Sequence, residues 1–303
     1  MVFSLRWAAF LGTAHAVVPT VEIAPGVDMP QVNLGTCCGS EATDAFPVWF
    51  SAGGRGVDTA LDYGKEVPGG TQAELGAALV KSGVARDEVF ITTKIRAGFD
   101  VSHGGPACIF QTSAHALSQV EQDLKELNVS QVDLVLLHAP CWSAAANLKL
   151  WQGLEQALEK NLTRAIGVSN YDKKDLAALL AGATVKPAVN QCQLSISHHA
   201  DEDIAYAASQ GIVYEAYEAM RGCPFTDART QAIAAAHKTG VSNVCLRYVL
   251  QKGSRMALAV GLGSNATKMP SYAAGNLDLF AFELTAGEMA YLDALADNAT
   301  APQ

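Results

Sequence analysis

The sequence predicts a (β/α)8 barrel from its length, its alternating segments and one well-marked βα unit. The chain has 303 residues and is 50% hydrophobic. This suits one large domain, since a barrel of this kind needs about 250 residues. Short apolar runs alternate with longer segments that carry apolar residues at helical spacing, as in parallel α/β folds. Between Gly54 and Gly76 a short strand, a loop and a helix follow one another.

Residues 1–16 have the features of a secretory signal peptide. Arg6 precedes an apolar run over 7–11, and Ala14-His15-Ala16 has the small-residue spacing of a cleavage site. We therefore predict a barrel domain over residues 17–303 that enters the secretory pathway, either secreted or held in the endoplasmic reticulum lumen. The alternative is an apolar leader on a cytoplasmic enzyme. Four sequons agree with a glycoprotein, at Asn128, Asn161, Asn265 and Asn298.

A β-hairpin and eight strands follow the leader. The hairpin is predicted because Val21–Ile23 and Met29–Leu34 flank a turn that contains Pro25 and Gly26. Each strand candidate is a short apolar run. The candidates are Val32–Leu34, Gly56–Asp58, Val89–Lys94, Val132–Leu137, Ala165–Val168, Ala188–Asn190, Ile212–Glu215 and Ala259–Leu262. Eight such strands with helices between them give a closed parallel barrel.

Helices with apolar residues every three or four positions separate the strands. The clearest are Gln72–Leu79, Ser113–Leu127 and Leu150–Lys160. Near the end of the chain, Thr285 and Glu288 are spaced as in a capping box at the start of a last helix. His198 and His199 precede three acids. Those acids open a helical pattern, where they favour the helix dipole, so we predict no metal site there.

Composition argues against several partners. The formal net charge is -9, and Lys and Arg form no cluster of the kind that binds nucleic acid. Beyond the leader, no segment approaches the length of a membrane span. The seven cysteines show no zinc-like spacing. We interpret most of them as small core or loop residues, and their odd number leaves at least one thiol unpaired. We expect a monomer.

Three motifs carry a family resemblance. They are GRGVDTALDYG at 54–64 followed by Glu74 and Gly76, ITTKI at 91–95, and LLHAP at 136–140 followed by AIGVSNY at 165–171. In these motifs the chain resembles the aldo-keto reductases, in consistent order over about residues 21–297. The resemblance implies a barrel whose N-terminal hairpin closes the bottom. It also implies reduction of an aldehyde or ketone, a small-molecule carbonyl substrate, by a nicotinamide cofactor.

Four candidate catalytic residues follow consecutive strands. Asp58, Lys94 and His138 fall at the carboxyl ends of the second, third and fourth predicted strands, where a barrel brings them to one mouth. Tyr63 lies just beyond the second. Carbonyl reduction needs a proton donor, and a buried ammonium is expected to lower the pKa of a nearby phenol. The resemblance implies Tyr63 as general acid, tuned by Lys94 and Asp58. It also implies that His138 orients the substrate or assists proton transfer.

Each of these residues also has an ordinary structural interpretation. Asp58 is compatible with a helix cap, Lys94 with a surface charge, and His138 with a core imidazole. Their joint order within matching motifs favours function. Two chemically different interpretations stay open: a Schiff-base aldolase that uses Lys94, and a cofactor-binding regulatory subunit without turnover.

The resemblance also implies a cofactor site. Ser169, Asn170 and Gln191 would bind the nicotinamide carboxamide and Tyr217 would stack on the ring, although loop capping is the alternative for the two amides. The GLGSNA run at 261–266 follows the last predicted strand, where glycines let backbone amides approach a phosphate.

The phosphate end of that site departs from the family. Gly263 stands where members carry a lysine, and Met269 stands where they carry an arginine. Lys268 is therefore the candidate for a 2′-phosphate, which makes NADPH the first choice and NADH the alternative. The predicted cofactor residues at this end are Gly263, Ser264, Lys268 and Asn276.

The predicted substrate pocket departs from the family as well. Cys37 and Ala139 stand where many members carry tryptophan, which should widen the pocket. The loop over 96–113 is longer than usual and could cover it. The aromatic side chains that could replace the missing walls are Phe99, Phe110 and Trp142.

Overall fold

The computed structural model describes residues 18–37, 42–64, 70–97, 108, 112–141 and 143–299. The predicted signal peptide over residues 1–16 lies outside the described residues, and so do Phe99, Phe110 and Trp142. The interpretation of these segments therefore stays a prediction.

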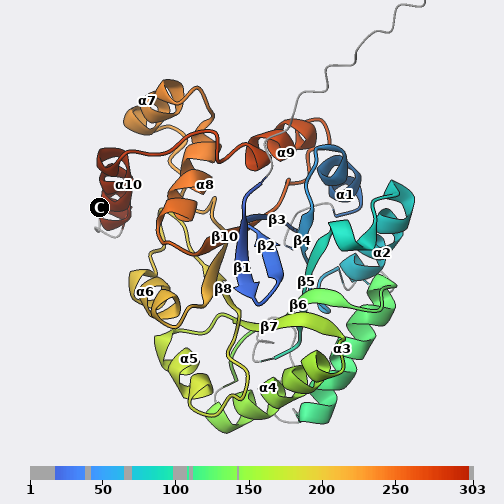
Figure 1. The fold of residues 1–303 in the computed structure, drawn as a ribbon. Helices are drawn as coiled ribbons and strands as arrows, with labels where there is room; N and C mark the ends of the chain where they lie inside the picture. The colour runs from blue at the N-terminus through green and yellow to red at the C-terminus, as the bar shows by residue number, and fades with distance from the viewer. Residues whose placement is uncertain are drawn as a thin grey trace, which may run out of the picture.

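Eight parallel strands form a closed barrel, as the sequence predicts. Their order is β10-β3-β4-β5-β6-β7-β8-β9, and β9 pairs with β10 to close the circle. The strands are β3 Val32–Gly35, β4 Gly56–Asp58, β5 Phe90–Ile95, β6 Val132–Leu137, β7 Thr163–Ser169, β8 Val189–Gln193, β9 Val213–Tyr217 and β10 Met256–Val260. Figure 1 views this barrel from one end, with the helices arranged around it.

The helices surround the strands, and α7 and α10 lie beyond α8 at the edge of the molecule (Figure 1). The helices are α1 Ala42–Ser51, α2 Gly70–Ser82, α3 Ser113–Leu127, α4 Ala144–Glu159, α5 Lys173–Leu180, α6 Asp201–Ser209, α7 Ala228–Ala236, α8 Val241–Gln251, α9 Met269–Leu277 and α10 Ala286–Ala299, with a short 3-10 helix η1 at Arg86–Glu88. Among the described residues, no helix combines the length and the apolar character that crossing a bilayer requires.

Local hydrogen bonds explain where several helices begin. The α4 helix starts at Ala144, earlier than predicted, because the Ser143 hydroxyl accepts a hydrogen bond from the Ala146 amide at 3.4 Å. The predicted capping box is confirmed before α10. The Thr285 amide donates to the Glu288 carboxylate at 2.8 Å, and the Glu288 amide donates back to the Thr285 hydroxyl at 3.3 Å.

The acids after the histidine pair open α6, as their effect on the helix dipole predicts. Asp201, Glu202 and Asp203 form the first turn of this helix. The imidazole of His199 lies 3.1 Å from the Tyr248 hydroxyl. His199 is thus part of a packed contact with α8.

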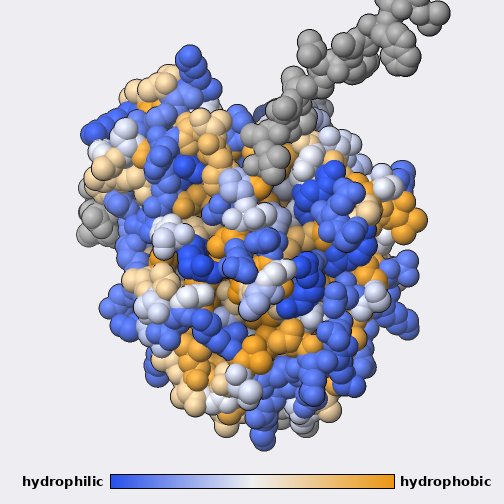
Figure 2. Space-filling model, viewed as in Figure 1, coloured by the Kyte–Doolittle hydropathy of each residue, from blue (hydrophilic) through white to orange (hydrophobic). Residues whose placement is uncertain are grey.

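The N-terminal hairpin closes the bottom of the barrel. Strands β1 (Thr20–Ala24) and β2 (Val27–Pro30) pair antiparallel, and Figure 1 shows them lying across the centre of the strand ring. Met29 belongs to a buried cluster with Phe90 and Leu134, from the first halves of two barrel strands. Outside, Arg255 donates to the Glu22 carbonyl at 2.6 Å. The surface at this end mixes hydrophilic and hydrophobic residues (Figure 2).

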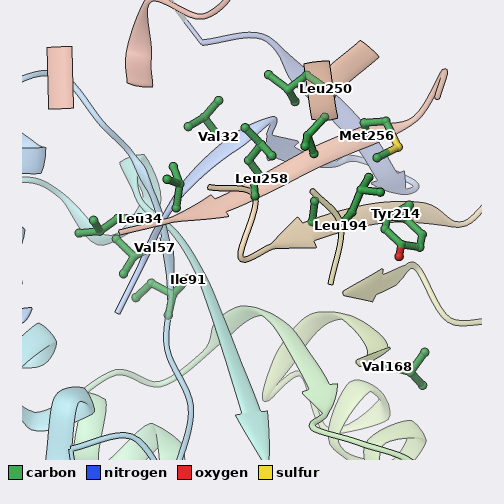
Figure 3. Close-up of a cluster of buried hydrophobic side chains, with 14 of the residues drawn as sticks. Val32, Leu34, Val57, Ile91, Val168, Leu194, Tyr214, Leu250, Met256 and Leu258 are labelled. Atoms are coloured by element: carbon green, nitrogen blue, oxygen red, sulfur yellow. The ribbon is translucent and has the colours of Figure 1, made fainter. Parts of the chain in front are cut away.

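Alternation along the strands separates two environments. Figure 3 shows side chains such as Val32, Leu34 and Val57, which belong to the hydrophobic cluster that the strands share with the surrounding helices. The intervening residues face the barrel interior, because successive side chains of a strand point to opposite faces. Toward the carboxyl ends of β4 and β5 these interior positions are polar, and they include Asp58 and Lys94.

The last barrel strand is displaced from its predicted position. It spans Met256–Val260 instead of Ala259–Leu262. Its ladder with β3 pairs Leu258 with Val32 and Val260 with Leu34, and the strand ends before Gly261. Leu262 is buried although it lies beyond the strand. The apolar pattern in the sequence therefore reflects burial at this position and not strand pairing.

A buried carboxyl group lies between α2, α3 and β5. Asp123 is fully buried, and the Gln72 side-chain amide donates both to it and, at 2.7 Å, to the Thr93 hydroxyl. Burial raises the pKa of Asp123 well above its ordinary value, although hydrogen bonds from Gln72 and Thr93 lower it. The second Asp123 oxygen has no hydrogen-bond partner among the described residues.

We expect the wild-type protein to lose stability as the pH rises to neutral and alkaline values, and we expect Asp123→Asn to lack this loss. A carboxyl group whose pKa is higher in the folded than in the unfolded chain lowers the free energy of unfolding as the pH rises between those two values. The slope is about 1.4 kcal/mol per pH unit. Asparagine has the same shape and no charge. Denaturation midpoints from pH 5 to 9 test this, with the exposed Glu121→Gln on the same helix as control, and an unchanged pH dependence in Asp123→Asn would contradict it.

Candidate active site

A buried ion pair lies at the carboxyl ends of β4 and β5. Lys94 Nζ is 2.6 Å from Asp58 Oδ1 and also donates to the Thr59 carbonyl at 3.0 Å. Lys94 is 0% exposed and Asp58 is 3% exposed. Burial alone lowers the pKa of Lys94, but Asp58 and other neighbours raise it above its ordinary value. Lys94 is therefore an ammonium ion at neutral pH.

Tyr63 lies beside this ion pair, in the turn after β4. The Lys94 ammonium is 5.0 Å from the centre of the Tyr63 ring. The turn is joined to α2 because the Thr71 amide donates to the Tyr63 carbonyl at 3.2 Å. A side chain at Gly70 would overlap that carbonyl, and the φ of Gly70 is 55°, so this position requires glycine.

The acidity of Tyr63 differs from the sequence prediction. Burial raises the pKa of Tyr63 to about 12, although the Lys94 charge lowers it. The effect of the Lys94 ammonium has the predicted direction, but the net pKa of Tyr63 is raised and not lowered. Desolvation of the phenolate outweighs the attraction of Lys94, and the Asp58 charge opposes it further. At neutral pH the Tyr63 hydroxyl carries its proton.

His138 follows β6 directly and lies against Tyr63. The two ring centres are 5.6 Å apart and the rings meet edge to face, at 71°. The His138 Nδ1 atom is 3.0 Å from the Asp62 carboxylate. This is an ion-pair distance only, because Asp62 Oδ1 accepts no hydrogen bond among the described residues. Sequence reasoning did not single out Asp62, although its place next to Tyr63 in the motif was a usable signal.

The predicted nicotinamide residues form one hydrogen-bonded group on β7, β8 and β9. The Asn170 amide donates to the His138 carbonyl at 2.9 Å and to the Ser169 hydroxyl at 3.1 Å. The Tyr217 hydroxyl donates to the Asn170 oxygen at 2.7 Å. Gln191 joins this group to the ion pair, because its Nε2 atom donates to Asp58 Oδ2 at 2.8 Å. The structure thus brings the predicted nicotinamide and catalytic residues into one connected cluster.

The predicted phosphate residues follow β10. Gly263 has a φ of 67° and nothing within 4 Å of the position that a side chain would take, so its backbone borders open space. Ser264 and Lys268 are exposed, and Lys268 immediately precedes α9. Asn276 lies instead on the buried face of α9.

Two predicted substrate-pocket residues are described. Ala139 is buried directly after His138, and Cys37 follows β3 and is disulfide-bonded. A disulfide between Cys108 and Cys141 ties the segment after β5 to the segment after β6. Of its two cysteines, Cys141 lies three residues after His138 in the sequence. This bond restrains the wall next to the imidazole.

The cysteines are more strongly paired than the sequence interpretation held. Besides Cys108 and Cys141, Cys223 is bonded to Cys245, so the view of most cysteines as plain core or loop residues is wrong. The prediction of at least one unpaired thiol is confirmed by Cys192, which is free. Burial raises the pKa of the Cys192 thiol to about 12, which keeps it protonated and unreactive.

Sequence reasoning missed two polar residues of the barrel interior. Glu215 is 0% exposed and accepts a hydrogen bond from Gln191 at 2.7 Å and another from Asn33 at 2.9 Å. The sequence contained a signal for Glu215. This residue precedes Tyr217 by two positions on the strand, so both side chains point to the same face. Gly56 makes room for this contact, since a side chain there would overlap the Asn33 amide.

The fold and the cluster define a (β/α)8-barrel protein whose polar side chains gather at the end where barrel enzymes carry their active sites. The chain belongs to the aldo/keto reductase family, whose model matches residues 35–297. Members of this family are oxidoreductases that use a nicotinamide cofactor and act on small-molecule carbonyl compounds.

Individual relatives cover nearly the whole chain. An aldo-keto reductase of Mycolicibacterium vanbaalenii is 36% identical over 286 residues, which are 93% of this chain and 94% of the relative. A glyoxal reductase of Bacillus subtilis is 32% identical over 281 residues, 91% and 92% of the two chains. The crystal structure of a Bombyx mori aldo-keto reductase in complex with NADP superposes with a TM-score of 0.76 at 25% identity, covering 92% of this chain and 93% of that one.

Proposed function

We propose that this protein reduces an aldehyde or ketone to the alcohol with NADPH, and that Tyr63 is the general acid. The observation that carries the proposal is the Lys94 and Asp58 ion pair, buried beside the Tyr63 ring. When bound, the reduced cofactor supplies a hydride to the carbonyl carbon. The carbonyl oxygen then needs a proton, and Tyr63 holds one at neutral pH. Lys94 stabilises the phenolate that remains after this transfer.

In this proposal His138 orients the substrate. In this role Nε2 carries the imidazole proton and donates it to a hydrogen bond with the carbonyl oxygen. The T-shaped contact between the two rings places Tyr63 and His138 next to each other, as two donors to one oxygen require. The small side chains of Ala139 and Cys37 would leave a wide mouth, which Phe99, Phe110 or Trp142 would narrow. The structure describes only the first two of these residues.

The described residues fit a nicotinamide cofactor. Ser169, Asn170 and Gln191 present a hydroxyl and two amides to a neutral carboxamide, and the Tyr217 ring offers an aromatic face. The open space at Gly263 suits the close approach of a phosphate to the backbone, and Ser264 adds a hydroxyl. Lys268 supplies the cation for a 2′-phosphate, which is the basis for NADPH with NADH as the alternative. Asn276 is assigned to the adenine end.

The two rival functions are less consistent with the site. A Schiff-base aldolase needs a neutral amine, whereas the surroundings of Lys94 raise its pKa and keep it protonated. A regulatory subunit without turnover would have no use for a complete proton-donating set, and here Tyr63, Lys94 and Asp58 lie in contact. We propose a monomeric enzyme.

Replacement of Tyr63 by phenylalanine tests the proposed acid. We expect kcat to fall by about 10²- to 10⁴-fold, the usual contribution of a positioned acid, while the Kd for NADPH changes little. Oxidation of NADPH and NADH with a panel of aldehydes and ketones measures this, and Tyr206→Phe on α6 is the matched control. Wild-type turnover in Tyr63→Phe would contradict the proposal. Tight binding without turnover in wild type would favour the regulatory subunit, and borohydride trapping at Lys94 would favour the aldolase.

Lys268→Met tests the assignment of NADPH. Loss of a charged contact to the 2′-phosphate should lower kcat/KM for NADPH by about tenfold and leave the value for NADH unchanged. Lys174→Met on the exposed side of α5 is the control. If wild type prefers NADH, or if the ratio of the two cofactors does not respond to Lys268→Met, the assignment is incorrect.

We also propose that the protein folds in the secretory pathway. Disulfides are typical of oxidising compartments, and the pairs Cys108–Cys141 and Cys223–Cys245 support this. Sequon residues Asn128 and Asn161 are exposed, as acceptors must be. Expression of the full chain in eukaryotic cells should give a product that a glycosidase shifts to lower mass. An unglycosylated cytoplasmic product with free thiols would contradict the proposal.

A further inference from the structure

Glu215 is a second carboxylate inside the barrel, and the proposed reaction gives it no role. It lies on β9 and is 0% exposed. Its two oxygens accept from different donors, Asn33 on β3 and Gln191 on β8, at 2.9 and 2.7 Å. Burial of a charge carries a large desolvation free energy, and an uncharged side chain could fill this space with a smaller one. A carboxyl group in this position therefore calls for a functional explanation.

The hydrogen bonds of Gln191 fix the direction of its amide. Its Nε2 atom donates to Glu215 at 2.7 Å and to Asp58 at 2.8 Å. The Asp58 carboxylate is paired with the Lys94 ammonium and can only accept, so the Gln191 nitrogen must point at it and the oxygen must point away. Within the described part of the chain, the side-chain oxygen of Gln191 accepts no hydrogen bond. This oxygen is not one of the fully buried atoms that lack a partner, so another molecule can reach it. That oxygen is left for an N–H donor from outside, such as a carboxamide.

The charges around Glu215 do not balance. Asp58 on β4 and Lys94 on β5 are the charged groups that act on it, and Gln191 and Asn33 are neutral donors. The neighbouring strand β10 has the sequence MALAV and contributes no ionisable group. With both carboxylates ionised, one lysine faces two acids. Burial and the Asp58 charge raise the pKa of Glu215 to about 8, although Gln191, Lys94 and Asn33 lower it.

We propose that Glu215 is a positioning residue for the cofactor: it fixes the Gln191 amide for the nicotinamide carboxamide, and once it has lost its proton its negative charge favours the oxidised ring over the reduced ring. This inference rests on the proposed use of a nicotinamide cofactor. The oxidised nicotinamide ring is cationic and the reduced ring is neutral, so an excess negative charge nearby stabilises only the former. When Glu215 is ionised, this preference for the oxidised product also favours hydride donation to the carbonyl.

Glu215→Gln tests the first half of the proposal. An amide has one accepting oxygen where the carboxylate has two, so Gln191 or Asn33 loses its acceptor. We expect the Kd values for NADP⁺ and for NADPH both to rise by about tenfold, because both carry the carboxamide. Binding of 2′-phospho-ADP-ribose, which lacks the nicotinamide, should not change. Fluorescence and calorimetric titrations measure all three ligands, and Glu159→Gln at the exposed end of α4 should match wild type throughout.

The pH dependence of affinity tests the second half. In wild type, the affinity for NADP⁺ relative to NADPH should rise as the pH passes about 8, because Glu215 loses its proton there. In Glu215→Gln the same ratio should stay constant. This readout distinguishes a role toward the nicotinamide from a merely structural one, which would weaken NADP⁺, NADPH and 2′-phospho-ADP-ribose alike. If the variant does not fold, the wild-type series still decides, since a constant ratio in wild type overturns the proposal.

The outcomes separate this inference from the function on which it rests. If wild type binds NADP⁺ and Glu215→Gln binds it equally well, the role of Glu215 is wrong while the reductase proposal stands. If wild type binds neither NADP⁺ nor NADPH, both are overturned. Weaker binding of 2′-phospho-ADP-ribose to Glu215→Gln would show general damage to the site and would also overturn the proposal.

Discussion

The buried ion pair of Lys94 and Asp58 is the interaction on which the rest of the site depends. Lys94 Nζ and Asp58 Oδ1 lie 2.6 Å apart inside the barrel, where the two side chains are 1% and 5% exposed. Removal of one partner from such a pair costs about 3–5 kcal/mol, because it leaves an unpaired buried charge. The pair holds an ammonium beside Tyr63 and leaves the second Asp58 oxygen for Gln191. The proton-donating side and the proposed nicotinamide side therefore share one carboxylate.

Barrel topology made much of this arrangement predictable. Parallel strands end at the same edge, so residues at the carboxyl ends of β4, β5 and β6 had to meet. The motifs placed Asp58, Lys94 and His138 at those ends, and the structure confirms their positions. Strand boundaries were harder to predict. Val260 and Leu262 are both buried, and only the hydrogen-bond ladder with β3 shows that the strand ends between them.

Other features could not be predicted, because they depend on the relative size of opposing effects on a pKa or on pairing between residues far apart in the sequence. The pKa of Tyr63 reflects burial against the Lys94 charge, and the sequence gives the sign of each contribution but not its size. Cys108 and Cys141 are 33 residues apart, and spacing alone cannot select a partner among seven cysteines. Glu215 was hidden for a different reason. It lies within an apolar strand pattern, and only its shared face with Tyr217 indicated the barrel interior.

Because the polar groups are connected, they act as a unit. Tyr217 bonds to Asn170, and Gln191 bonds to both Asp58 and Glu215. Barrel interiors are usually filled by branched apolar side chains, and here the lower layer follows that rule with Leu134 and Val213. The upper layer is polar, and in a medium of low dielectric constant its members depend on one another as hydrogen-bond partners, although the Asn33 side-chain oxygen has no partner among the described residues. Changes at Gln191 and Asp58 should therefore be non-additive, since each removes the acceptor or the donor of the other. The same connection means that cofactor binding and proton donation cannot be altered independently at these positions.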